Sequence, residues 1–196
     1  ILTFDREFES AGNEIAQAVA EKLNLPYYDR FLITASADES GVKLNDALAK
    51  DEKLESRFEY SHAQAAYYYT SSESHLPTGA RVAKAQFDLI RRIAEEGPCV
   101  IVGRCAGHVL RERNDVASIF VHASRESRLQ RTMSSLELPE RDADRVLRQT
   151  DKARMAYHKN YTEHELTDPD QYHLILNSDL MSPEQCVDLI CAFYQA

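Results

Sequence analysis

Four consecutive apolar residues, Cys99-Val100-Ile101-Val102, lie between the helix-ending pair Gly97-Pro98 and Gly103. A continuous apolar run of this length is typical of a central parallel strand, because helices cover both faces of such a strand. The run therefore predicts an α/β fold in which a parallel sheet is buried between helices.

Four other segments have the pattern of strands, and helical patterns alternate with them. The strands are expected near residues 1–4, 26–28, 118–122 and 172–176. The helices are expected over residues 14–23, 78–96, 104–113 and 125–136, from Pro139 to about 157, and after Pro183. Strands that alternate with helices imply right-handed crossovers, so the sequence predicts a three-layer α/β/α fold with a five-stranded parallel sheet.

Residues from about 38 to 77 depart from this alternation. They are compatible with helices but contain no strand pattern, so they predict a helical insertion over one end of the sheet. The whole chain of 196 residues is otherwise expected to form a single domain, residues 1–196.

The opening residues have the pattern of a strand, a turn and a helix. Free backbone N–H groups at a helix N-terminus favour anions, so phosphates bind at this place in mononucleotide-binding proteins. On the G-x-x-x-x-G-K-[ST] spacing the chain keeps Gly12. It has Glu7 at the first glycine, Asn13 at the lysine and Glu14 at the Ser/Thr position. The order of elements indicates nucleotides, while the chemistry of the turn is an open question.

The net charge of −9 argues against a nucleic-acid-binding surface. The segment 125–159 nevertheless carries nine Lys/Arg and six Asp/Glu. This segment is either a binding region for a small anionic molecule or a pair of solvated helices of mixed charge. No apolar run approaches the roughly 20 residues that span a bilayer, so no membrane partner is expected.

The cysteines and histidines show no metal-binding pattern. The four cysteines, Cys99, Cys105, Cys186 and Cys191, form no C-x-x-C pair, and we expect reduced, packed thiols in a cytoplasmic protein; disulfides or a metal site are the less favoured alternatives. The seven histidines have no ligand spacing such as H-x-x-x-H.

Several segments together resemble the cytidylate kinase-like family, within the P-loop nucleoside monophosphate kinases. The strongest are CVIVGRCAGHVL (99–110), SIFVHASRESRLQR (118–131), TDKARMAYHKNYT (150–162) and YHLILNSDLMSPEQCVDLI (172–190). Residues 3–33 resemble the start of the family, where a Gly-Ser-Gly-Gly turn is usual. The resemblance implies a P-loop NTPase core, an ATP and Mg²⁺ site, a substrate-binding insertion at about 38–77 and a lid at about 132–162.

The resemblance also implies roles for individual residues. Residues of the turn and the helix start would hold the donor phosphates: Ser10, Ala11, Gly12, Asn13 and Glu14. Residues that match substrate-binding positions are Asp29, Arg104, Asp151 and Arg154, and the lid arginines that meet ATP are Arg128 and Arg131. Arg6 lies in the turn itself and could replace the charge of the missing lysine.

Two positions depart from the pattern of the family. The usual Gly-Ser-Gly-Gly is Glu9-Ser10-Ala11-Gly12, and a carboxylate at Glu9 would repel phosphates at short range. Cys105 stands where a second aspartate is usual, so one carboxylate that reads cytosine is missing.

Each candidate also has a purely structural interpretation. Arg6 could pair with Glu9 or Glu14, and Asp151 could pair with Arg154 three residues away. Asp29 could cap the helix expected from Arg30. Arg128 and Arg131 could lie on a solvated helix face. The run Tyr67-Tyr68-Tyr69 could stack on a base, or, as we prefer, pack the insertion onto the core or onto a second subunit in a homodimer.

Three functions are consistent with these features. The leading hypothesis is a cytoplasmic kinase that transfers phosphate from ATP, with Mg²⁺, to a nucleoside monophosphate of the cytidylate type or a related small acceptor. The second is a degenerate kinase fold that binds a nucleotide or a protein partner without catalysis. The third is a kinase for a metabolite that is not a nucleotide.

Overall fold

The five expected strands form one parallel sheet in the computed structural model, which describes residues 1–29 and 78–195. Their order across the sheet is β2-β3-β1-β4-β5, and every neighbouring pair is parallel. The strands are β1 (Leu2–Arg6), β2 (Tyr27–Tyr28), β3 (Val100–Val102), β4 (Ala117–His122) and β5 (Leu174–Asn177). The predicted α/β fold with a five-stranded parallel sheet is therefore confirmed.

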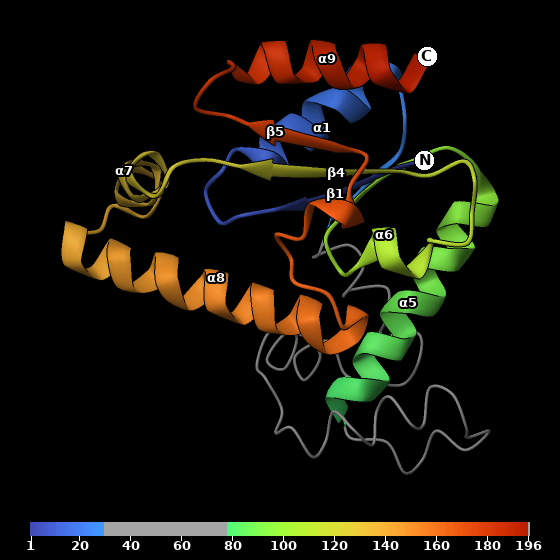
Figure 1. The fold of residues 1–196 in the computed structure, drawn as a ribbon, viewed down its shortest axis with the longest axis horizontal. Helices are drawn as coiled ribbons and strands as arrows, with labels where there is room; N and C mark the ends of the chain where they lie inside the picture. Colours follow the sequence, from blue (N-terminus) through green and yellow to red (C-terminus); the bar gives the residue numbers. More distant parts are fainter. Residues whose placement is uncertain (30–77, 196) are drawn as a thin grey trace.

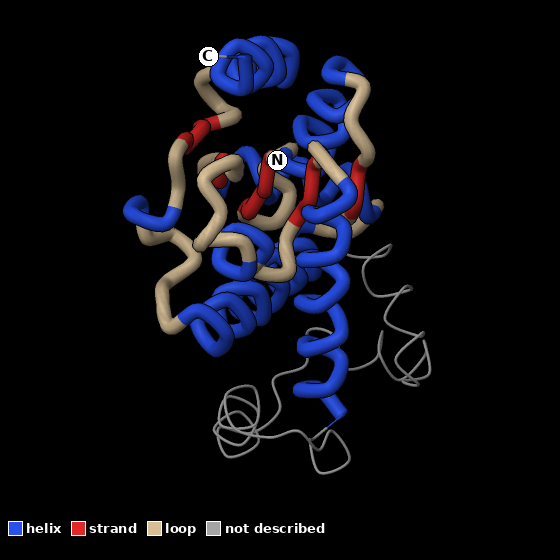
Figure 2. The backbone as a smooth tube through the Cα atoms, turned by 90° about the vertical axis from the view of Figure 1, so that its right-hand side faces the viewer, coloured by secondary structure: helices blue, strands red, loops and turns tan. Residues whose placement is uncertain are grey.

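Helices lie on both faces of the sheet (Figures 1 and 2). α1 (Gly12–Leu23) and α9 (Pro183–Gln195) pack together on one face. On the other face lie α5 (Thr78–Glu96), α6 (Ala106–Val109) and α8 (Glu140–Thr162) (Figure 1). α7 (Arg125–Leu136) packs against α8, and a 3₁₀ helix, η3 (Pro169–Gln171), precedes β5.

The helix expected over residues 104–113 is the least accurate prediction. The structure has only the four residues of α6, Ala106–Val109, in helical conformation. Arg104 and Cys105 both adopt left-handed φ angles of 56°, so the helix begins only after them. α5 and α7 begin and end as predicted, α1 begins two residues earlier, and α8 continues beyond 157 to Thr162.

Apolar side chains of the central strands divide between the two faces. Leu2 and Phe4 of β1 pack with α1 and α9, in a cluster that includes Ile15 and Ile190. Ile101 of β3 lies in a second cluster, with Ile90 and other residues of α5 and α6. Burial on both faces of the sheet accounts for the continuous apolar run at β3.

The face toward α6 also carries polar residues on the central strands. Thr3 Oγ1 donates a hydrogen bond to Ser118 Oγ on the neighbouring strand at 3.1 Å. Gly107 of α6 lies directly over this pair: a Cβ on Gly107 would be 2.7 Å from Ser118 Oγ and 3.2 Å from Thr3 Oγ1. The absence of a side chain at Gly107 therefore lets α6 approach the sheet closely.

Some expectations concern residues that the structure does not describe. The insertion at about 38–77 and the run Tyr67-Tyr68-Tyr69 lie outside the described residues. The four cysteines are all buried free thiols, as predicted. Among the helices of residues 1–29 and 78–195, none has the length and apolar character needed to cross a bilayer.

Replacement of Gly107 by alanine is expected to lower the free energy of unfolding by about 1–3 kcal/mol, because the new methyl group overlaps Ser118 Oγ. Urea denaturation measures the change. The double variant Gly107→Ala/Ser118→Ala should recover most of the loss, since it removes the nearest clashing atom. A double variant as unstable as the single one would show that this contact does not set the packing of α6.

Candidate functional site

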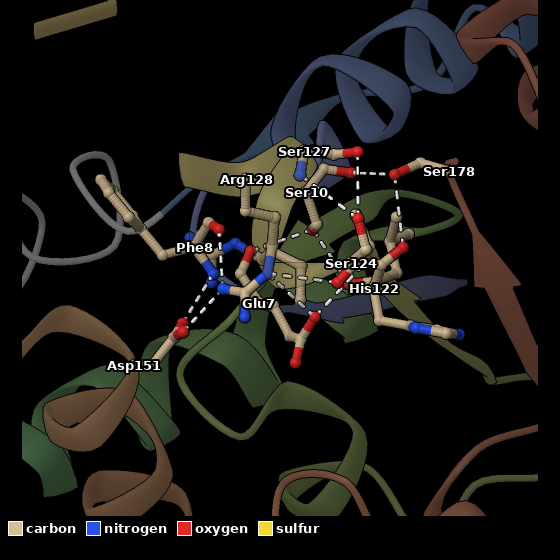
Figure 3. A network of polar contacts seen from close by, with 12 residues as sticks. Glu7, Phe8, Ser10, His122, Ser124, Ser127, Arg128, Asp151 and Ser178 are labelled. Carbon is tan, nitrogen blue, oxygen red and sulfur yellow. Dashed lines mark hydrogen bonds and ion pairs between the residues drawn. The ribbon is translucent and has the colours of Figure 1, made fainter. Parts of the chain in front are cut away.

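The turn between β1 and α1 lies at the carboxyl end of the central strand and is tied to its neighbours through Ser10. The buried Ser10 hydroxyl lies 2.9 Å from the carbonyl oxygen of Glu7 and 3.0 Å from that of Val121 in β4. Ser178, after β5, donates from its hydroxyl to the Ser10 carbonyl at 2.8 Å (Figure 3). The turn is thus fixed to the ends of two other strands.

A cavity of about 200 Å³ opens at this turn. It is lined by residues 6–14 and by Arg154 of α8. The structure therefore brings together Arg6, Arg154 and all the residues that the resemblance assigns to donor phosphates, Ser10, Ala11, Gly12, Asn13 and Glu14. The cavity size suits a phosphate group or a short phosphate chain.

Arg6 is the last residue of β1, so the prediction that it lies in the turn is wrong, although it does line the cavity. Its side chain is buried, and its Nε donates to Asn13 Oδ1 at 2.8 Å. A Cβ on Gly12 would lie 2.6 Å from Arg6 Cβ, and a Cβ on Gly103 would lie 2.9 Å from Arg6 Nη1. The two glycines therefore leave the space that the arginine fills. Asn13, at the lysine position of the phosphate-loop motif, orients the guanidinium.

Arg128 is buried beneath the turn, with only 8% of its side chain exposed. Its Nη1 donates to Asp151 Oδ2 at 2.6 Å and to the Phe8 carbonyl at 3.1 Å. Its Nε lies 3.2 Å from Glu7 Oε2 and donates to the Ala123 carbonyl at 3.3 Å. The interpretation of Arg128 as part of a solvated helix face is therefore wrong.

The two acidic partners of Arg128 also bind backbone N–H groups (Figure 3). Glu7 Oε2 accepts from Ala123 N at 3.2 Å, and Asp151 Oδ1 accepts from Phe8 N at 3.0 Å. Glu7, Arg128 and Asp151 thereby join the turn to α7 and α8. We call these three residues the Arg128 clamp.

Arg131 lies on the same helix as Arg128 but near solvent. Its Nη2 donates to Glu14 Oε1 at 3.3 Å, and 39% of the Arg131 side chain and 63% of that of Glu14 are exposed. Arg154, in contrast, extends from α8 toward the turn, where its Nη1 donates to the Arg6 carbonyl at 2.9 Å.

Arg104 follows β3 after one residue, Gly103, at the same edge of the sheet as the turn. It is buried, and its guanidinium carbon is 4.6 Å from the ring centre of Tyr157 in α8, a cation–π distance. The Tyr157 hydroxyl donates to Gln86 Oε1 at 3.2 Å, which links the stack to α5. Arg104 has a left-handed φ of 56°, a conformation that costs free energy in a residue with a Cβ.

Two further candidate positions, Cys105 and Asp29, lie at the same edge of the sheet as Arg104. Burial raises the pKa of the Cys105 thiol well above its usual value, so the neutral thiol adds no charge where the resemblance has an aspartate. Asp29 follows β2 at this edge, while the helix expected from Arg30 lies outside the described residues.

Sequence reasoning missed three contacts that shape the site. They are the pairing of Glu7 with Arg128, the stacking of Tyr157 on Arg104, and the hydrogen bond from Ser178 to the turn. The sequence contained a signal only for the first, because an acid in a phosphate-type turn requires a nearby cation or an outward orientation.

A parallel sheet with a phosphate-type turn after its first strand defines a P-loop kinase-like protein. The model of the cytidylate kinase-like family matches residues 1–180, and the chain belongs to this family. The resemblance seen in the sequence is therefore confirmed. No curated protein matches the sequence.

Three solved structures share the fold, and two of them are kinases. An uncharacterized protein from Eubacterium ventriosum has a TM-score of 0.71 at 22% identity, with 100% of this chain and 98% of that chain covered. Shikimate kinase from Bacteroides thetaiotaomicron has a TM-score of 0.55 at 13% identity, with coverage of 100% and 98%. A sugar kinase from Janibacter has a TM-score of 0.51 at 18% identity, with coverage of 99% and 93%. At these identities the similarity shows the fold alone.

Arg128→Ala is expected to lower the free energy of unfolding by about 3–5 kcal/mol, because it leaves the carboxylates of Glu7 and Asp151, which are only 16% and 14% exposed, without their cation. Arg131→Ala, three residues along the same helix, should cost less than about 1 kcal/mol, since its ion pair is exposed. Thermal or urea denaturation of both variants measures the difference. Equal small losses would show that the Arg128 clamp contributes little to stability.

Proposed function

We propose that this protein is a cytoplasmic phosphotransferase that moves phosphate from ATP, with Mg²⁺, to a small acceptor. The observation that carries the proposal is the cavity at the end of β1, which combines a phosphate-type turn, the N-terminus of α1 and the cationic residues Arg6 and Arg154. A nucleoside monophosphate of the cytidylate type is the first acceptor to test, because the chain belongs to the cytidylate kinase-like family. The buried reduced thiols support the cytoplasm as the compartment.

In this proposal the backbone of the turn binds the donor phosphates and Arg6 supplies the missing positive charge. The Ser10 hydroxyl already bonds to carbonyl oxygens, so backbone N–H groups from Ser10 to Asn13 are the donors toward phosphate. Arg6 is held by Asn13 at the lysine position, which places a guanidinium near the start of α1. A guanidinium binds phosphate oxygens in a bidentate manner and keeps its charge at any working pH.

The remaining arginines divide into a positioning group and a reacting group. Arg128 fixes the turn through Glu7, Asp151 and the Phe8 carbonyl, so we assign it a positioning role and no contact with phosphate. Because Glu7 pairs with Arg128, the guanidinium offsets the repulsion between the Glu7 carboxylate and bound phosphates. Arg154 and Arg131 are the cations that would stabilise the transferring phosphoryl group, within the lid proposed at about 132–162 and the helix before it.

Asp29 and Arg104 form the acceptor side of the proposed site. Stacking on Tyr157 orients the Arg104 guanidinium, which suits recognition of an acceptor phosphate. Within the described residues no group of three His, Cys, Asp or Glu could hold a metal ion. Mg²⁺ would then be held mainly by the nucleotide phosphates, with Asp29 bound through water, and it would neutralise their charge.

A second candidate function is nucleotide or partner binding without catalysis. Glu9 and Glu14, which line the cavity, favour it because their carboxylates would repel a triphosphate. A third is phosphorylation of a metabolite that is not a nucleotide, which the neutral thiol at Cys105 favours. A homodimer formed through residues 38–77 stays a prediction, since that segment lies outside the described residues.

Arg6→Gln is expected to weaken ATP binding about tenfold or more, because a charge-assisted contact contributes roughly 1.5–3 kcal/mol. Calorimetric titration with ATP and Mg²⁺ measures the affinity. Lys22→Ala, which removes an exposed cation paired with Asp188 at the other end of α1, is the control and should bind as the wild type does. Unchanged affinity for ATP in Arg6→Gln would show that Arg6 does not bind the phosphates.

Consumption of ATP across a panel of nucleoside monophosphates separates the functions. The kinase proposal predicts turnover with at least one acceptor, and Arg104→Ala should reduce that turnover while ATP binding persists. ATP binding without turnover on nucleotides or on sugars and hydroxy acids would favour the non-catalytic function. Absence of ATP binding would contradict both nucleotide hypotheses.

A further inference from the structure

Glu14 lies in the first turn of α1 and lines the cavity at the end of β1. On the phosphate-loop spacing it takes the position of the Ser or Thr whose hydroxyl usually binds Mg²⁺. In nucleotide sites Mg²⁺ is bound by one or two carboxylates together with the substrate phosphates. The replacement of a hydroxyl by a carboxylate therefore keeps an oxygen ligand at this position and adds a negative charge to it.

The Glu14 carboxylate pairs with Arg131 of α7 near solvent. Arg131 Nη2 donates to Glu14 Oε1 at 3.3 Å, and both side chains are largely exposed. Exposed ion pairs stabilise a protein only weakly, because water and salt screen them. This pair can therefore separate at little cost when a stronger partner binds to either residue.

The charges around the cavity are balanced. The charged side chains that line it are those of Arg6, Arg154, Glu7, Glu9 and Glu14. Glu7 already pairs with Arg128, so two carboxylates remain beside two guanidinium groups. A triphosphate without a metal ion would meet repulsion from these carboxylates as well as attraction to the arginines. A triphosphate that carries Mg²⁺ has less negative charge and brings a cation to the carboxylates, so the balance favours the metal complex.

We propose that the Glu14 carboxylate is a ligand for the Mg²⁺ ion of the nucleotide, in place of the usual hydroxyl. This inference rests on the proposed function, because the nucleotide phosphates would supply the other ligands. When the complex binds, Glu14 would exchange Arg131 for the metal ion, and Arg131 would be released to the phosphate oxygens. The exchange keeps each of these charges paired. Glu14 then selects the metal complex over the bare triphosphate.

A single carboxylate makes binding of the metal dependent on the nucleotide. Within residues 1–29 and 78–195 no three His, Cys, Asp or Glu side chains form a group that could hold a metal ion. Glu14 would therefore bind Mg²⁺ only together with phosphates. Because such a linkage is reciprocal, Mg²⁺ should strengthen ATP binding by the same factor as ATP strengthens Mg²⁺ binding.

The test is calorimetric titration of ATP into the full chain, once with Mg²⁺ and once with EDTA in its place. The ratio of the two dissociation constants gives the enhancement of ATP binding by Mg²⁺. In Glu14→Gln this enhancement should fall about tenfold or more, because one charged ligand of the metal is lost. The fall should come from weaker binding with Mg²⁺, while binding in EDTA should be equal or tighter.

Three further variants separate the contributions. Glu14→Thr places the usual hydroxyl at this position and should keep more of the enhancement than Glu14→Gln does. Glu21→Gln removes an exposed carboxylate from the last turn of the same helix and should leave the enhancement unchanged. Arg131→Ala should weaken ATP binding more with Mg²⁺ than in EDTA, because Glu14 competes for Arg131 only while the metal is absent.

Two results in Glu14→Gln would overturn the proposal. Tighter ATP binding under both conditions would show that Glu14 only repels the phosphates. An unchanged enhancement would leave Glu14 as an acid that stabilises the first turn of α1 through the helix dipole. In either case ATP binding by the wild type would leave the proposed function standing. The same titrations with tripolyphosphate test Glu14 if ATP does not bind and the proposed function fails, and binding of neither would overturn both.

Discussion

The buried guanidinium of Arg128 is the interaction on which the phosphate turn depends. A charge removed from water requires close partners of opposite charge, and Arg128 finds them in Glu7 and Asp151. Phe8 contacts Arg128 across 120 residues of sequence and Asp151 across 143. The conformation of the turn is therefore set by two helices from the other half of the chain.

This arrangement would allow a turn with an acid at its first glycine position to bind phosphates, as the proposed function requires. The Glu7 carboxylate is directed to Arg128, and Arg6 lies on the side of the turn that carries Asn13 and Gly12. Gly12 and Gly103 are required here by the space that the Arg6 side chain occupies. In the proposed site, the cation Arg6 comes from the preceding strand, whereas the usual motif has a lysine on the helix.

Much of the fold could be predicted from local patterns. The apolar run at β3, the alternation of strands and helices, and the bounds of α5 and α7 follow from periodicity and capping, which depend on near neighbours. The predicted helix 104–113 was too long, because Arg104 and Cys105 have left-handed φ angles and the helix begins only after them. The pattern of apolar residues does not indicate φ angles, so it could not predict this later start.

The candidate site was predictable in its residues and not in its contacts. Family resemblance selected the turn, Arg104, Asp151 and Arg154, and the structure brings the turn and Arg154 to one cavity. The burial of Arg128 and the stacking of Arg104 on Tyr157 depend on contacts between distant segments. Spacing along the sequence contains no information on such contacts.

The central claim is that the turn after β1 holds nucleotide phosphates with Arg6 as their cation. A crystal structure of the protein with a non-hydrolysable ATP analogue and Mg²⁺ tests it most directly. The account predicts phosphate oxygens within hydrogen-bond distance of backbone N–H groups between Ser10 and Asn13 and of the Arg6 guanidinium, with the Arg128 clamp unchanged. A nucleotide bound elsewhere, or a turn with Glu9 or Glu14 filling the phosphate position, would contradict it.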